Sequence, residues 1–70
     1  MNQQPELVSL EQVPEVVMKA AREKLPNVRF DSAWKAREHG QEVYEVRGKT
    51  SEGKVFEVEV TPDGKVVGVE

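Results

Sequence analysis

The segment Lys54-Val55-Phe56-Glu57-Val58-Glu59-Val60 decides the fold of this 70-residue chain, because it carries the cleanest alternation of apolar and charged residues. Successive side chains of a β-strand point to opposite faces of a sheet, so this pattern predicts a strand. Phe56, Val58 and Val60 are expected on the buried face, and the two glutamates between them on the solvent face. Another element must therefore cover one side of the sheet.

Turns bound this strand on both sides. Residues 61–64 carry proline and glycine where a tight turn favours them, and residues 65–69 then form a last strand at the sheet edge. Upstream, residues 51–53 form a turn that follows a strand over 43–46. The segment 38–41 is expected to be the turn before that strand.

The first strand is predicted from the alternation of Val28, Phe30 and Trp34 with charged residues, and Ser32 fills the remaining inward position. Four consecutive strands joined by short turns predict an antiparallel meander. We expect the helix to cover the face that bears Phe30 and Trp34.

A helix is expected before the strands. Residues 9–12 (Ser-Leu-Glu-Gln) fit a capping box, and Pro14 fits a first helical turn. Either the helix begins at Leu10, or a short turn precedes a helix that begins at Pro14. The second alternative is favoured, because a proline at the fifth helical position would clash with the preceding turn. Pro26 ends the helix. Its apolar face comprises Val13, Val17, Ala20 and Ala21.

The composition supports this order of elements. Thirteen of the 26 apolar residues are valine, which favours strands, and most of the valines follow residue 40. The sequence therefore predicts an α+β fold, with one N-terminal helix on one face of a four-stranded antiparallel sheet. A single domain is expected over residues 9–70, and the polar residues 1–8, which include Pro5, are expected to form a flexible arm.

Charge and composition exclude several classes of protein. The formal net charge of −3 argues against nucleic-acid binding. The absence of cysteine excludes disulfides, thiol catalysis and thiolate zinc sites. No segment approaches the roughly 20 apolar residues that a membrane-spanning helix needs. The chain also shows no secretory signal segment.

Catalytic and metal-binding sets are also lacking in the sequence. His39 is the single histidine, and its acidic neighbours Glu38 and Glu42 do not make a metal site. We interpret His39 as a solvated turn residue. No serine has a base beside it, so we expect no catalytic residues, no metal and no cofactor.

The solvent face of the sheet is the candidate docking surface for a protein or peptide. Its predicted residues are Arg29, Lys35, Glu45, Arg47, Glu57 and Glu59. Two interpretations of Trp34 remain open: packing in the core, which is favoured, or partial exposure as an interface anchor.

Short motifs along the chain resemble the PepSY and PepSY-like domains. The similarity covers roughly residues 9–70 and follows the order of that family. It comprises Leu10, Val13, Pro14 and Val17 as Leu-x-x-Val-Pro-x-x-Val, then Leu25-Pro26, Val43-Tyr44-Glu45-Val46 and Asp63-Gly64-Lys65-Val66-Val67.

The resemblance implies a helix on an antiparallel sheet in a secreted or periplasmic setting, without catalytic residues. Domains of this family occur in metallopeptidase propeptides, and the beta-lactamase inhibitor protein contains two related units. It implies a module that binds a protein or peptide partner, with an inhibitory or chaperone-like role. The alternative is a structural or accessory domain that self-associates or packs against its own parent chain and has no independent ligand. The expected oligomeric state is a monomer or a weak homodimer.

Overall fold

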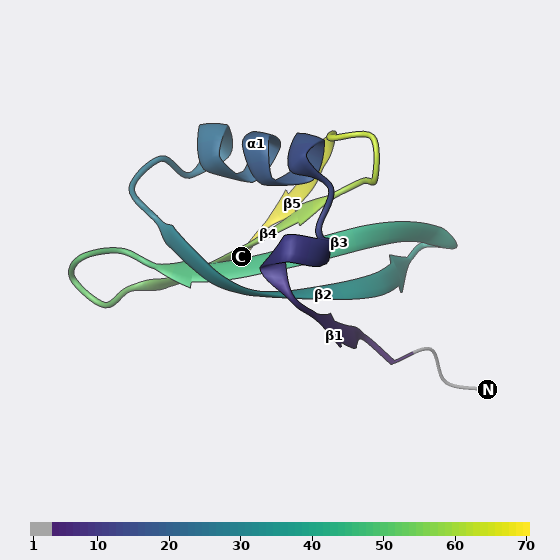
Figure 1. The fold of residues 1–70 in the computed structure, drawn as a ribbon, viewed down its shortest axis with the longest axis horizontal. Coiled ribbons are helices and arrows are strands. Elements are labelled where there is room, and N and C mark those ends of the chain that lie inside the picture. Colours follow the sequence, from purple (N-terminus) through teal and green to yellow (C-terminus); the bar gives the residue numbers. More distant parts are fainter. Residues whose placement is uncertain (1–3) are drawn as a thin grey trace.

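The computed structural model describes residues 4–70 and shows one α-helix packed on one face of a five-stranded antiparallel sheet (Figure 1). The predicted α+β class is therefore confirmed. The strands follow one another across the sheet in the order β1-β2-β3-β4-β5. The elements are β1 (Glu6–Val8), the 3-10 turn η1 (Leu10–Gln12), α1 (Glu15–Lys24), β2 (Arg29–Glu38), β3 (Gln41–Lys49), β4 (Val55–Val60) and β5 (Val66–Val69).

The first strand, β1, lies where the sequence predicted part of a loose arm, so the prediction of four strands is wrong by one. Leu7 pairs with Trp34 and Val8 pairs with Ala33, in antiparallel register. A three-residue strand is too short to show a periodicity, which is why the pattern did not indicate it. Residues 1–3 of the predicted arm lie outside the described residues.

The helix begins beside Pro14, after a short turn, as the favoured alternative predicted. The Ser9 N–H donates a hydrogen bond of 2.9 Å to Gln12 Oε1 and closes the turn η1 ahead of the helix. Pro14 is the N-cap of α1. At the other end the Leu25 N–H donates to the Ala21 carbonyl at 3.0 Å, and Pro26 then prevents a further turn.

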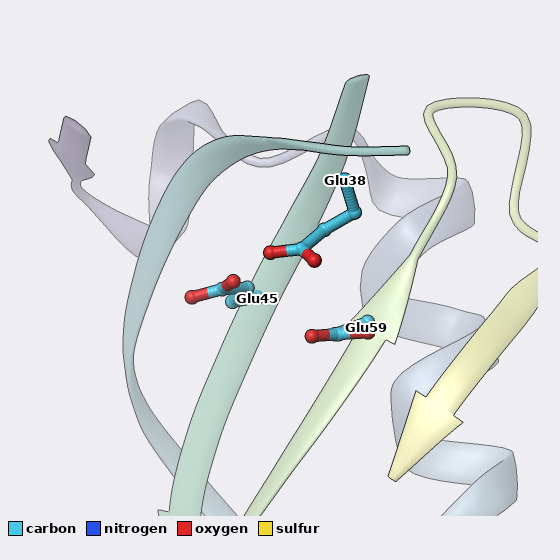
Figure 2. A group of neighbouring side chains, drawn as sticks. All are labelled: Glu38, Glu45 and Glu59. Carbon is cyan, nitrogen blue, oxygen red and sulfur yellow. The ribbon is translucent and has the colours of Figure 1, made fainter. Parts of the chain in front are cut away.

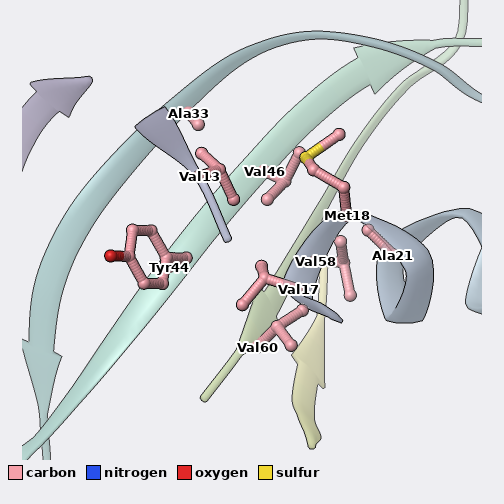
Figure 3. Packing of buried hydrophobic residues seen from close by; sticks show 9 residues of the cluster. All are labelled: Val13, Val17, Met18, Ala21, Ala33, Tyr44, Val46, Val58 and Val60. Atoms are coloured by element: carbon pink, nitrogen blue, oxygen red, sulfur yellow. The ribbon is translucent and has the colours of Figure 1, made fainter. Parts of the chain in front are cut away.

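The core is a thin layer of small side chains between α1 and the sheet (Figure 3). Its buried members are Val13, Val17, Met18, Ala21, Ala33, Tyr44, Val46, Val58 and Val60. The predicted inward positions of Val58 and Val60 are confirmed. Phe56 is only half-buried and lies outside this cluster, with the Lys54 ammonium 5.3 Å from its ring centroid. The helix therefore covers Val58 and Val60 more completely than Phe56.

A β-bulge at Asp31 inverts the alternation of β2. Phe30 pairs with Gly48, but the next residue of β3, Arg47, pairs with Ser32. Two residues of β2 thus oppose one residue of β3, and every later side chain changes face.

Because of the bulge, three residues of β2 lie on the opposite face of the sheet from the one predicted. Ala33, which pairs with the buried Val46, takes the inward position expected for Ser32. Trp34 turns to the face away from the helix, so its predicted packing in the core is wrong. Lys35 turns to the helix side, so its predicted place on the solvent face is also wrong.

Gly48 makes the bulge possible, because a Cβ at this position would lie 2.0 Å from the Arg29 carbonyl oxygen. We predict that Gly48→Ala lowers the free energy of unfolding by about 3 kcal/mol, since the clash is with backbone that cannot rotate away. Equilibrium unfolding in urea measures this loss.

Gly53→Ala is the matched control. Gly53 has φ +85° and open space around it, so the added methyl group costs only backbone strain, about 1 kcal/mol. Equal losses in the two variants would contradict the close approach at Gly48.

Candidate functional site

The sheet face that α1 does not cover carries most of the predicted docking residues, and we name it the open face. The antiparallel register places Trp34, Glu45 and Glu59 in one row across β2, β3 and β4. Arg47 and Glu57 form the next row. Leu7 extends the first row onto β1, because it pairs with Trp34.

Trp34 and Arg47 form the aromatic and cationic part of the open face. The Arg47 guanidinium lies 5.0 Å from the centroid of the Trp34 ring, and its Nη2 atom lies 3.3 Å from Glu57 Oε1. An exposed cation–π contact of this kind contributes about 0.5–1 kcal/mol. Arg47 of β3 thus links the half-buried indole of β2 to Glu57 of β4.

Three glutamates converge beside this pair (Figure 2). Carboxylate oxygens of Glu38, Glu45 and Glu59, from three different strands, lie within 4.8 Å of one another, and each residue is half-buried. The helix lies behind the sheet in this view, on the other face. We name these residues the glutamate cluster.

Gly68 on β5 leaves the space that the Glu59 carboxylate occupies. A Cβ at Gly68 would lie 2.6 Å from Glu59 Oε1. The carboxylate therefore lies over the bare backbone of the neighbouring strand, and this position helps to keep Glu59 close to Glu38 and Glu45.

Burial and neighbouring negative charge make Glu45 and Glu59 harder to ionise. Burial raises the pKa of Glu45 from its ordinary 4.5 to about 7, helped by a hydrogen bond and like charge from Glu57 and by the charges of Glu59 and Glu38. Burial also raises the pKa of Glu59, as do the charges of Glu38, Glu70 and Glu57, while His39 opposes this shift. The open face therefore carries unfavourable negative charge at neutral pH.

The chemistry of the cluster is that of hard oxygen ligands. Carboxylates bind Ca²⁺ or Mg²⁺, but Ca²⁺ takes about six to eight oxygen ligands, of which three carboxylates supply only part. His39 is exposed in the two-residue β2–β3 turn, where it and Gly40 both have positive φ (54° and 76°). This geometry fits a hairpin turn, as predicted, and directs His39 into solvent.

The structure brings together five of the predicted docking residues: Glu45, Arg47, Glu57, Glu59 and Trp34, which is partly exposed as its second interpretation expected. Arg29 lies exposed at the end of β2, opposite Lys49, away from the glutamate cluster.

Lys35 lies on the helix side of the sheet, where its Nζ atom is 3.7 Å from Glu42 Oε2. The sequence analysis missed Leu7 and Glu38 as members of the open face. Gly48 was the sequence signal that could have identified Glu38, because a glycine inside a strand pattern indicates a bulge. The bulge puts Glu38 on the same face as Trp34.

Comparisons with protein-family models, curated proteins and solved structures found no match to this chain. The resemblance to PepSY domains therefore stays a prediction. Within residues 4–70, the structure has no helix that is both long and apolar enough to cross a membrane.

The glutamate cluster predicts a pH-dependent stability. The folded pKa of Glu45 is raised, so the proton that Glu45 takes up stabilises the folded state. This contribution is fully present below about pH 4.5 and is lost as the pH rises through about 7. We expect the melting temperature to rise when the pH falls from 8 to about 5.5.

Glu45→Gln isolates this effect, because glutamine keeps the size of the side chain without its charge. We expect the variant to melt at a higher temperature than the wild type at pH 8, and to lose much of the change between pH 8 and pH 5.5. Glu23→Gln, an exposed position on α1, is the control. An unchanged pH profile in Glu45→Gln would show that the cluster does not set the stability.

Proposed function

We propose that this chain is a non-enzymatic binding module that docks a protein or peptide partner on its open face. The observation that carries the proposal is the position of Trp34, half-buried on a sheet face that α1 leaves uncovered. Its cross-strand neighbour Leu7 is 69% exposed. Tryptophan is among the residues most enriched at the energetic centres of protein interfaces, so Trp34 is the anchor and Leu7 adds apolar surface beside it.

The charges around Trp34 favour a particular kind of partner. The glutamate cluster and Glu57 outweigh the single cation Arg47 on this part of the face. A segment that presents lysine or arginine side chains would relieve the repulsion among the carboxylates. Such complementarity selects partners and accelerates encounter more than it adds affinity.

The setting of this activity follows from the resemblance to PepSY domains. It supports a location in the cell envelope or outside the cell, and an inhibitory or chaperone-like role toward the partner. The small size of the chain fits such a module, because a domain of 70 residues buries one thin core and has little room for an enclosed active site.

Capture of partners from a cell-envelope extract tests the docking surface. We expect immobilised wild type to enrich a defined set of proteins, and Trp34→Ala to lose them, because the variant removes the anchor. A double reversal, Arg47→Glu with Glu57→Arg, keeps an ion pair on the face but exchanges its signs, and should weaken capture as well.

Val16→Ala is the matched control, because Val16 is 47% exposed on α1, away from the open face. Val16→Ala should melt within a few degrees of the wild type, since surface substitutions usually change stability by about 0.5 kcal/mol. The circular dichroism of the other variants checks that they fold. Capture that survives in Trp34→Ala at the wild-type level would show that the partner binds elsewhere.

A further inference from the structure

The outer edge of β5 is an exposed sheet edge, separate from the open face. Among the described residues, β5 has a neighbouring strand only on its β4 side. Its sequence is Val-Val-Gly-Val, and the side chains of Val67 and Val69 are 46% and 41% exposed. Many edge strands carry a lysine or another charge, or a proline, which hinders pairing with further strands. The four residues of β5 carry no charge and no proline.

The hydrogen bonds around β5 show which backbone groups remain available. Glu70 exchanges two hydrogen bonds of 2.7 Å with Glu57, and Lys65 bonds to Thr61 through its carbonyl at 2.8 Å and its N–H at 3.0 Å. Both flanking residues therefore direct their backbone toward the body of the protein. Since the orientation alternates along a strand, Val66 and Val69 direct theirs outward.

The irregular register of β5 explains this spacing. Val66 pairs with Val60 and Gly68 pairs with Glu59, so Val67 is an extra residue between them. In a regular strand, residues three positions apart direct their backbone N–H and C=O groups to opposite edges. Without the extra residue Val67, the groups of Val66 and Val69 would therefore point to opposite sides. With it, Val66 and Val69 both present N–H and C=O groups at the outer edge.

We propose that a second copy of this chain pairs with the outer edge of β5, antiparallel, with Val66 of each copy opposite Val69 of the other. The pairing joins the two sheets into one continuous sheet about a two-fold axis near Val67 and Gly68. Val66 and Val69 both pair with helix-side residues of β4, so their side chains meet on the same face.

Charge complementarity identifies the occupant as a second copy. In this register Lys65 of each copy lies opposite Glu70 of the other, so the interface contains two opposite-charge pairs. Lys65 and Glu70 lie on the same side of the sheet, because Glu70 pairs with Glu57 on the open face and Lys65 precedes the helix-side Val66. Cross-strand pairs of opposite charge stabilise a sheet by about 0.2–1 kcal/mol each.

The other edge of the sheet does not offer this complementarity. The strand β1 has only three residues, of which Glu6 is the charged one, so two copies paired there would gain no opposite charge. A four-residue strand also covers less area than a standard stable interface. We therefore infer a dimer that forms with rising concentration.

Sedimentation of the wild type over a range of concentrations tests the pairing, and charge exchange tests its register. With Lys65→Glu, a glutamate at position 65 of each copy faces Glu70 of the other copy, at both ends of the paired strands. With Glu70→Lys, two lysines face each other at the same two places. Each substitution should weaken the dimer about tenfold. The double variant restores opposite charges and should return the dissociation constant close to the wild-type value.

Leu7→Lys, on the β1 edge, is the matched control and should leave the dimer unchanged, and the circular dichroism of each variant confirms that it folds. A monomer at every concentration up to about 1 mM would overturn the proposal, as that corresponds to a pairing free energy weaker than about −4 kcal/mol. A dimer insensitive to both charge changes, or not rescued by the double variant, would also overturn it. Trp34→Ala should still dimerise, so this experiment and the partner-capture experiment fail independently.

Discussion

The close approach of β2 to Gly48 is the constraint on which the two faces of the sheet depend. Because Gly48 has no side chain, the Arg29 carbonyl can lie where a Cβ would otherwise be, and Asp31 becomes an extra residue in β2. The consequence is a change of face for each later residue of β2. Ala33 then fits under the helix beside Val46, in a layer made mostly of valine and alanine, and the bulky Trp34 lies on the other side. One small residue on β3 thus decides both the packing of the core and the character of the open face.

The parts of the fold that could be predicted are those whose evidence lies within a few residues. The alternation over 56–60, the turn at His39 and the start of the helix near Pro14 each depend on local backbone and side-chain preferences, and the structure agrees with them. The face of Trp34 could not be predicted from the period of β2 alone, because its register depends on a contact with residues that follow in β3. A glycine inside a strand pattern indicates such a contact, whereas the three residues of β1 offer no comparable signal.

The glutamate cluster lowers the stability of the fold at neutral pH. Glu38, Glu45 and Glu59 come from separate strands, so their proximity follows from the fold and not from neighbouring positions in the sequence. Burial and the charges of neighbouring carboxylates disfavour the ionised forms of Glu45 and Glu59. The hydrophobic layer on the other face of the same strands offsets this cost. Val46 of β3 and Val58 of β4 are fully buried on that face. Local conflict of this kind on an otherwise consistent fold is expected where a surface serves binding.

Glu70 connects the two proposed surfaces. Its charge contributes to the raised pKa of Glu59, so it belongs electrostatically to the glutamate cluster. In the proposed dimer, Lys65 of the second copy lies opposite Glu70 and offsets that negative charge. Pairing should therefore lower the pKa of Glu59, and by thermodynamic reciprocity a proton on Glu59 should weaken the pairing. The coupling is small, because the residues are partly exposed and salt screens their charges. Its direction is nevertheless fixed by the signs of the charges: conditions that protonate the open face favour the folded monomer, and conditions that ionise it favour the joined sheet.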